Sequence, residues 1–297
     1  MSERAAADTT FTVAGVGDHT VTAYRWDPEG APRVIVQLTH GMGEHAQRYG
    51  HLARTLTARG AVVVAQDHRG HGASMVGSRA PGDLGPGGWA ALVEEIGLLT
   101  AATRAEFPDL PLVLLGHSMG SFAVQQHLLR PGVDADAVVL TGTAALDLLE
   151  PALDLDQPIE LSAFNAPFAP ARTDHDWLSR DEAQVDAYVA DPLCGFGLDQ
   201  ESGRQMFERA RPVADPAALG VVRRDLPLLV AVGEADPVNA GLALVGPLVQ
   251  RYRGVLDDVT LVTYPAARHE ILNETNRDEV EADLVGWIAA RTPLRAT

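Results

Sequence analysis

The chain has 297 residues, 46% hydrophobic and 21% charged, which is enough to bury the core of one or two domains. Its formal net charge of −17 argues against nucleic-acid binding, because contacts to phosphates need clustered cations. All 23 basic residues are arginines, and the absence of lysine excludes Schiff-base chemistry and a phosphate-loop lysine.

The composition also indicates in which cellular compartment the protein is located. No apolar run approaches the roughly 18 residues that a membrane span requires, and residues 1–10 lack the apolar core of a secretory signal, so we expect no stable membrane anchor. A single cysteine, Cys194, rules out an internal disulfide. These features predict a cytoplasmic protein. The oligomeric state is not predicted by any feature of the sequence.

The predicted elements begin with an antiparallel hairpin over residues 11–16 and 19–26, where two alternating segments flank a Gly-Asp turn. Short apolar segments, several of them rich in valine, then predict strands that are buried on both faces of a parallel sheet. They span residues 33–40, 61–67, 111–116, 136–142, 226–233 and 259–265. Helical patterns lie between most of them, at 46–59, 89–106, 118–130, 239–252 and 277–291. The alternation predicts a layered α/β fold with a mostly parallel eight-stranded sheet flanked by helices.

One long interval interrupts this alternation. Residues 143–225 contain no clear buried strand and are rich in proline and loops, which is typical of an inserted subdomain. We therefore expect an α/β core formed by residues 1–142 and 216–297, with a cap over residues 143–215.

The most informative segment is "PLVLLGHSMGSFAVQQHLL", residues 111–129, in which Ser118 stands between two glycines where a strand meets a helix. Glycines let the backbone bend sharply there, and the turn exposes the serine oxygen at the carboxyl end of the strand. The start of the helix supplies free N–H groups and a positive dipole end, which stabilise an oxyanion. Ser118 is therefore predicted to be a nucleophile.

A serine hydroxyl needs a general base and an acid that orients it, in the chain order Ser, acid, His in this architecture. "LPLLVAVGEADPVNA" offers Glu234 and Asp236 after a late strand. Asp236 is the predicted acid, and Glu234 is interpreted as a solvated loop carboxylate. His269, after the last strand, is the predicted base.

The second requirement is a pair of backbone donors for the oxyanion. The loop "THGMGEH" follows the third strand, and its glycines allow the N–H of Met42 to face the cleft. The N–H of Met119, directly after the nucleophile, is the other predicted donor. His40 is interpreted as a structural residue of this loop.

Three further blocks make the chain similar to a known family. They are "HGMGEHAQRYGHLARTLTARG" (40–60), "AQDHRGHGAS" (65–74) and "GHSMGS" (116–121), together with "GEADPVN", "ARHEILNE" and the segment at 178–193. The chain resembles the monoacylglycerol lipase and lysophospholipase group of the α/β-hydrolase superfamily over nearly all of residues 20–290. The resemblance implies esterase or lipase activity on an acyl ester, no cofactor, and a mobile cap over an apolar acyl pocket. Methionine at position 42, where many members have a smaller residue, leaves the acyl preference open.

The "DHRGHGAS" segment holds Asp67, Arg69 and His71, a combination that resembles a metal or acid–base site. Spacing alone is weak evidence for a metal, so we predict a hydrogen-bonded loop that braces the loop of Met42, and no metal site in the protein.

The predicted cap is strongly acidic. Between Asp147 and Asp215 lie 15 acidic and 5 basic residues, a net charge of −10. Such a cap should be repelled by anionic lipid surfaces, which favours neutral or soluble esters; a general role in solubility is the alternative. The apolar cap residues expected to line an acyl tunnel are Phe164, Phe168, Trp177, Leu178 and Phe196.

Other functions remain open at this point. A thioesterase or a cofactor-free perhydrolase could use the same three residues. A peptidase is less favoured because no acidic cluster for an amino terminus is evident. A non-catalytic binding module usually lacks one of the three residues, and here all are present. Serine at position 118 disfavours dehalogenase and epoxide hydrolase chemistry, which needs a carboxylate there.

Overall fold

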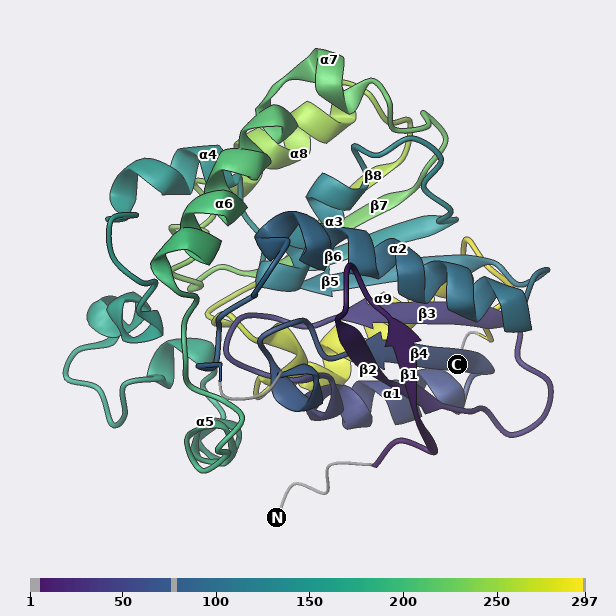
Figure 1. The fold of residues 1–297 in the computed structure, drawn as a ribbon, viewed down its shortest axis with the longest axis horizontal. Helices are drawn as coiled ribbons and strands as arrows, with labels where there is room; N and C mark the ends of the chain where they lie inside the picture. The colour runs from purple at the N-terminus through teal and green to yellow at the C-terminus, as the bar shows by residue number, and fades with distance from the viewer. Residues whose placement is uncertain (1–5, 76–78, 296–297) are drawn as a thin grey trace.

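A computed structural model describes residues 6–75 and 79–295 and contains one eight-stranded sheet (Figure 1). The strands are β1 (Thr9–Ala14), β2 (Thr20–Trp26), β3 (Val34–Thr39), β4 (Ala61–Gln66), β5 (Leu112–His117), β6 (Ala137–Thr141), β7 (Leu228–Gly233) and β8 (Val259–Tyr264). Their order across the sheet is β1-β2-β4-β3-β5-β6-β7-β8. Only the β1–β2 and β2–β4 pairs are antiparallel. The predicted mostly parallel, eight-stranded sheet is confirmed.

The central strands are apolar because both of their faces are covered. Every residue of β3, β4, β5, β6 and β7 is buried. Successive side chains of a strand point to opposite faces, so Ile35 of β3 packs into one core while Val34 and Val36 pack into the other. The sheet therefore separates two hydrophobic cores, as the continuous apolar segments of the sequence predict.

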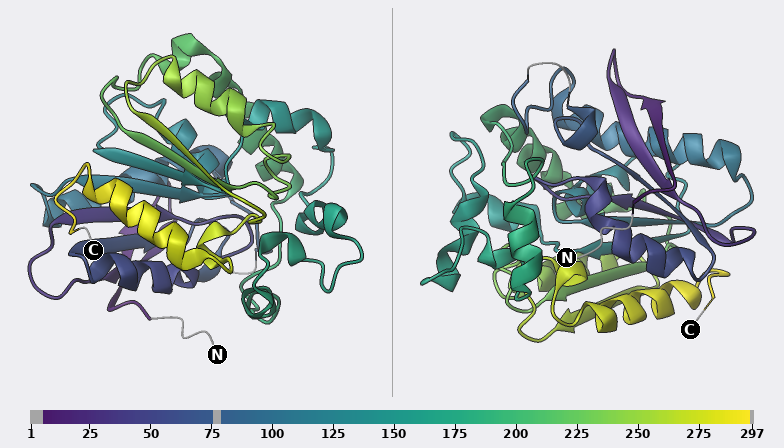
Figure 2. Two further views of the ribbon diagram at one scale, coloured as in Figure 1. Left: turned by 180° about the vertical axis from the view of Figure 1, so that it is seen from behind. Right: turned by 90° about the horizontal axis from the view of Figure 1, so that it is seen from below.

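Helices cover both faces of the sheet. They are α1 (Gly50–Thr57), α2 (Gly88–Glu106), α3 (Met119–His127), α8 (Val245–Arg253) and α9 (Arg277–Ala289), with short 3₁₀ helices at Ala46–Tyr49, Gly72–Ser74 and Ile271–Asn273. Side chains of α2, α3 and α8 pack into one core, and those of α1 and α9 into the other. Figure 2, seen from behind, shows α8 and α9 on opposite sides of the sheet. Among the helices of the described residues, none combines the length and the apolar composition needed to cross a membrane.

The segment between β6 and β7 contains helices and no strand, all within described residues, as its sequence predicts. Its α-helices are short: α4 (Leu146–Leu149), α5 (Glu182–Val189), α6 (Gln200–Ala210) and α7 (Pro216–Leu219). Short 3₁₀ helices occupy Glu150–Ala152, Leu161–Phe168, Asp176–Leu178 and Arg211–Ala214. Aspartates start α5, α6 and α7, where their carboxylates accept first-turn N–H groups. The segment gathers at one end of the molecule (Figures 1 and 2).

Two predicted boundaries need correction. The first strand ends at Ala14 because Gly15 already donates to the His19 carbonyl and closes the turn. The helix expected from residue 239 begins only at Val245. Ala240 and Leu242 have φ angles of +52° and +74°, which a right-handed helix does not contain.

Candidate active site

Ser118 directly follows β5 and has an unusual backbone conformation. Its φ of +51° and ψ of −123° lie outside the regions that side-chain-bearing residues normally adopt, a form of strain found at functional sites. The flanking glycines make the turn possible. A Cβ on Gly120 would lie 2.3 Å from the Thr39 carbonyl oxygen, and one on Gly116 would lie 2.7 Å from the Ser121 Cα. Only glycine therefore lets α3 begin so close to β3 and hold Ser118 in the turn.

The side chains of Ser118, His269 and Asp236 form a hydrogen-bonded chain. The Ser118 Oγ lies 2.8 Å from His269 Nε2, and His269 Nδ1 lies 2.9 Å from Asp236 Oδ2. A carboxylate only accepts, so Nδ1 carries the proton and Nε2 accepts the Ser118 O–H. The other Asp236 oxygen accepts the Val238 N–H at 2.9 Å. The fold thus brings together the three residues that the sequence singled out, while Glu234 is exposed at the surface.

The surroundings of His269 set its protonation. Burial lowers its pKa, but the charge and hydrogen bond of Asp236 raise it more, so the net pKa lies above the ordinary 6.5. The ring of His117 lies 5.0 Å from that of His269, and burial together with His269 lowers the pKa of His117 to about 3. A neutral His117 therefore leaves His269 as the basic imidazole beside Ser118.

The loop after β3 lies directly against the nucleophile. A Cβ on Gly41 would lie 3.1 Å from the Ser118 Cβ. Met42 and Met119 line the same small cavity as Ser118, and Met119 is the first residue of α3. Ser118 is the residue before the first turn of α3, so the positive end of the helix dipole lies beside it.

The "DHRGHGAS" loop braces the loop of Met42, as predicted. The Asp67 carboxylate accepts the Ala46 N–H at 2.8 Å and the Tyr24 hydroxyl at 2.9 Å. His40 Nε2 accepts the His68 N–H at 2.9 Å. The Ala46–Asp67 and His68–His40 hydrogen bonds connect the segment around Met42 to the loop after β4.

A small apolar cavity lies above Ser118. Its wall consists of Ser118 and of residues from the loop of Met42, from α3, from the segment between β6 and β7 and from the loop after β7: Met42, Met119, Phe122, Leu149, Leu153, Ile159, Leu161, Phe164, Trp177, Met206, Phe207 and Val238. The Trp177 ring lies 4.8 Å from the ring of His269, so the inserted segment contacts the candidate base itself. The cavity offers an apolar group a place beside the serine oxygen.

Comparisons with known proteins agree with this geometry. The model of the Hydrolase_4 family, described as "Serine aminopeptidase, S33", matches residues 30–276. The chain belongs to this α/β-hydrolase family. A monoacylglycerol lipase of Mycolicibacterium smegmatis is 34% identical over 93% of this chain and 95% of its own length. The human monoglyceride lipase is 30% identical over 92% of this chain and 88% of its own.

Among solved structures, a thermostable carboxyl esterase from Bacillus coagulans in complex with glycerol superposes with a TM-score of 0.85. It is 28% identical and covers 96% of this chain and 99% of its own. The predicted α/β-hydrolase fold and the resemblance to monoacylglycerol lipases are confirmed. These relatives support the predicted carboxylester hydrolase function.

The placement of the five predicted tunnel residues is mixed. Phe164 and Trp177 are on the cavity wall. Phe168, Leu178 and Phe196 are not on the wall of this cavity. Phe168 lies under the Arg268 guanidinium, 4.3 Å from its carbon. Leu178 is buried, and its carbonyl accepts the Glu270 N–H at 2.7 Å.

Phe196, the fifth residue, packs its ring 5.1 Å from that of His71 and lines an outer hollow. Ile159 and Leu161 lie on the walls of both the outer hollow and the inner cavity. Sequence pattern alone did not distinguish these places, because each depends on how the short helices of the insertion fold back on the core.

The structure contains a buried charge network that the sequence analysis did not predict. Arg48 donates to Glu44 at 2.5 Å and to both oxygens of Glu270 at 2.6 and 2.8 Å. Glu44 also accepts the Gly41 N–H and the Tyr49 hydroxyl, each at 2.6 Å. Burial lowers the pKa of Arg48, but the two carboxylates raise it well above its usual range.

This network connects the loop of Met42 to the residue after His269. It therefore fixes the nucleophile's two neighbouring loops relative to each other. In the sequence, the network is indicated only by the charged residues of "GEHAQRY" and "RHE". Arg48 and Glu270, which pair with each other, are 222 residues apart in the chain.

Proposed function

We propose that this protein is a carboxylester hydrolase that cleaves neutral monoacylglycerols through an acyl-enzyme on Ser118. The observation that carries the proposal is the hydrogen-bonded chain from Ser118 through His269 to Asp236, at the foot of an apolar cavity. The similarity to lipases named for monoacylglycerol and monoglyceride favours the glycerol ester as substrate.

In the first half-reaction, the Ser118 Oγ attacks the ester carbonyl while His269 Nε2 takes the hydroxyl proton. Asp236 keeps the imidazole in the tautomer that can accept and stabilises its charged form. The imidazolium then gives its proton to the departing glycerol oxygen, the carbon–oxygen bond to glycerol breaks, and the acyl group remains on Ser118.

In the second half-reaction, water replaces glycerol. His269 takes a proton from the water as it attacks the acyl carbonyl, and returns that proton to Ser118 as the fatty acid leaves. In both steps the backbone N–H groups of Met42 and Met119 hold the oxyanion; loss of one such donor costs on the order of 100-fold or more in rate.

Residues 143–215 form the cap in this proposal, over a core of residues 1–142 and 216–297. The cavity above Ser118 is small, so an acyl chain needs its cap residues to move apart. Phe164, Trp177 and Leu153 would then contact the chain, while Phe196 would lie nearer the entrance. The cap's net charge of −10 repels anionic headgroups and leaves neutral esters favoured.

The test is a panel of substrates that share one acyl chain. Initial rates are measured for 1-dodecanoylglycerol, for zwitterionic and anionic dodecanoyl lysophospholipids, for dodecanoyl-CoA and for an aminoacyl p-nitroanilide. We expect the glycerol ester to have the highest kcat/KM, and Ser118→Ala to lose about 10⁴-fold or more.

The alternatives appear as distinct outcomes. A preference for dodecanoyl-CoA would identify a thioesterase, and cleavage of the anilide alone would identify an aminopeptidase. Turnover of ester that persists in a folded Ser118→Ala variant would overturn the role of this serine. Acceleration by anionic vesicles at low salt would contradict the electrostatic part of the proposal.

We also propose a cytoplasmic location, supported by the single cysteine, which is buried in part and reduced in such a compartment. Fractionation of source cells with an antibody against the protein tests it; recovery in an extracellular fraction would contradict it.

A further inference from the structure

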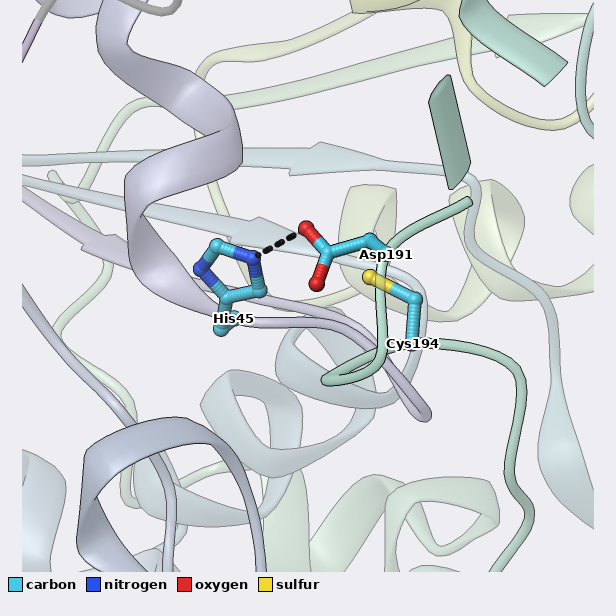
Figure 3. A group of neighbouring side chains, drawn as sticks. All are labelled: His45, Asp191 and Cys194. Atoms are coloured by element: carbon cyan, nitrogen blue, oxygen red, sulfur yellow. Dashed lines mark hydrogen bonds and ion pairs between the residues drawn. The ribbon is translucent and has the colours of Figure 1, made fainter. Parts of the chain in front are cut away.

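Three metal-binding side chains meet between the loop of Met42 and the inserted segment. His45 follows the Gly41–Gly43 turn, and Asp191 and Cys194 lie on the loop after α5 (Figure 3). Their ligand atoms all lie within 4.8 Å of one another, and His45 Nε2 is 3.1 Å from Asp191 Oδ2. The side chains of His45 and Asp191 are only 7% and 10% exposed. This group has no part in the hydrolytic steps described above.

The donor set is one nitrogen, one oxygen and one sulfur, a combination suited to Zn²⁺ and neighbouring divalent metals. A tetrahedral zinc site places its ligand atoms roughly 3.3–3.8 Å apart, given bonds of about 2.0–2.3 Å. The His45 Nε2 to Asp191 Oδ2 separation of 3.1 Å is close to this range, and the Cys194 sulfur lies within 4.8 Å of both ligand atoms. Asp191 and Cys194 are three residues apart, the shortest spacing of paired ligands in structural zinc sites.

The loop that carries two of the ligands is already shaped around them. The Cys194 N–H donates to the Asp191 carbonyl at 3.0 Å, and the Leu193 N–H donates to Asp191 Oδ1 at 2.9 Å. The second bond orients the carboxylate and leaves Oδ2 toward His45, as outer-shell partners of metal ligands do. Asp191, Leu193 and Cys194 therefore form a turn that presents its oxygen and sulfur on one side.

The local charge also accepts a divalent cation. The charged groups that act on the Cys194 thiol are Arg48, Asp191, Glu44 and Glu270, three carboxylates against one guanidinium. Arg48 is itself paired with Glu44 and Glu270, so its charge is offset. A bound dication therefore faces a net negative environment.

We propose that His45, Asp191 and Cys194 bind one Zn²⁺ or similar divalent transition-metal ion, with a fourth position open to solvent or a small ligand. The ion bonds to His45 Nε2, to an Asp191 oxygen and to the Cys194 sulfur. The ring proton that Asp191 accepts from His45 Nε2 is replaced by the metal while Nδ1 takes up the proton of the neutral ring, and the thiol proton leaves to solvent. This proposal differs from the prediction of no metal. That prediction was based on the loop at Asp67 and did not include His45, Asp191 and Cys194.

The site joins two parts of the molecule that meet beside the candidate oxyanion loop. The Gly43 carbonyl already accepts the Gly195 N–H at 3.0 Å and the Tyr188 hydroxyl at 2.8 Å. A metal bridging His45 to Asp191 and Cys194 would reinforce these contacts and hold the loop after α5 to the segment next to Met42. Metal binding is thus expected to raise the unfolding midpoint of the whole enzyme.

The experiment uses Co²⁺ as a spectroscopic substitute on the full-length enzyme after chelator treatment and gel filtration. Cys194 is the chain's only thiol, so a thiolate-to-cobalt charge-transfer band reports this residue alone. We expect a band that saturates at one Co²⁺ per chain, is displaced by Zn²⁺, and is abolished in Cys194→Ser. In Asp191→Asn and His45→Gln the affinity should fall about 10-fold or more.

The matched control is His51→Gln. His51 makes a similar pair with a carboxylate, Glu281 at 2.8 Å, but is half exposed and has no thiol in the group. Its substitution should leave the band unchanged. No band in the folded wild type, or Zn²⁺ affinity by calorimetry that is equal in wild type and Cys194→Ser, would overturn the site. Both readouts are independent of hydrolysis.

Discussion

A charge network at the carboxyl edge of the sheet and an ion pair on the outside of the inserted segment differ in burial. At the sheet edge, Arg48 is bonded to Glu44 and Glu270 with all three side chains 6% exposed or less. In the insertion, Arg172 pairs with Asp186 where the side chains are 37% and 60% exposed. A buried pair is costly to break, whereas an exposed pair contributes little. The comparison indicates a rigid catalytic edge beneath a segment whose contacts can be exchanged.

The secondary structure also differs between the carboxyl edge of the sheet and the inserted segment. Strands β3, β5 and β7 end in the loops of Met42, Ser118 and Asp236, and each strand is fully buried. The insertion consists of short helices and turns, of which α6 is the longest α-helix with 11 residues. In our proposal, the buried strands set the reaction geometry, and residues of the insertion contribute to the choice of substrate.

The largest expected effect is at the rigid edge. Asp236→Asn should reduce kcat by about 10⁴-fold, because the imidazole loses its orienting charge and its useful tautomer. It should also move the acid limb of kcat/KM. In the wild type we expect that limb above pH 6.5, since Asp236 raises the pKa of His269 and only the neutral ring accepts a proton. Without the carboxylate, burial lowers the pKa, and the limb shifts to lower pH.

Glu234→Gln is the matched control for this measurement, since Glu234 is an exposed carboxylate two residues away. Its pH–rate profile should coincide with that of the wild type. An unshifted acid limb in Asp236→Asn would mean that Asp236 does not set the titration of His269.

Breaking the buried ion pair tests the stability side of the comparison. Arg48→Met leaves Glu44 and Glu270 buried without their cation, so the free energy of unfolding should fall by about 3–5 kcal/mol. Equilibrium urea unfolding measures the change. A loss below about 1 kcal/mol would show that this network does not hold the edge together.

A substitution in the cavity wall should change selectivity more than stability. Leu153→Trp fills space above Ser118 and should lower the kcat/KM ratio of p-nitrophenyl laurate to p-nitrophenyl butyrate about 10-fold. Leu148→Trp is the control, because Leu148 is 41% exposed and outside the cavity wall. Equal ratios in the two variants would place the acyl chain elsewhere.

The smallest effect is expected for the exposed pair. Arg172→Ala should leave both the unfolding midpoint and the ester rates unchanged within measurement, because water solvates Asp186 once its partner is lost. A drop in the midpoint comparable with that of Arg48→Met would erase the distinction between the two regions.

The sequence predicts those features that depend on residues close to one another in the chain. Continuous apolar segments mark strands buried on both faces, and glycines around Ser118 mark a turn that only they permit. Asp236 and His269 were identifiable because each follows a strand, and parallel strands end at one edge of the sheet.

The sequence does not predict contacts between residues that are far apart in the chain. Arg48 and Glu270 meet only after the chain has folded, and their separation in sequence leaves no periodic signal. Leu153 and Met206 lie on the cavity wall, whereas Phe168 and Leu178 do not, because the path of short helices depends on tertiary contacts. Apolar character alone therefore does not identify which residues of the insertion line the cavity.

The most direct test of the central role given to Ser118 is covalent labelling with a fluorophosphonate, read by intact mass and peptide mapping. The wild type should gain one adduct, on Ser118, and His269→Gln should be labelled much more slowly because the hydroxyl has lost its base. An adduct on another residue, or no adduct on a protein that still hydrolyses esters, would contradict the account.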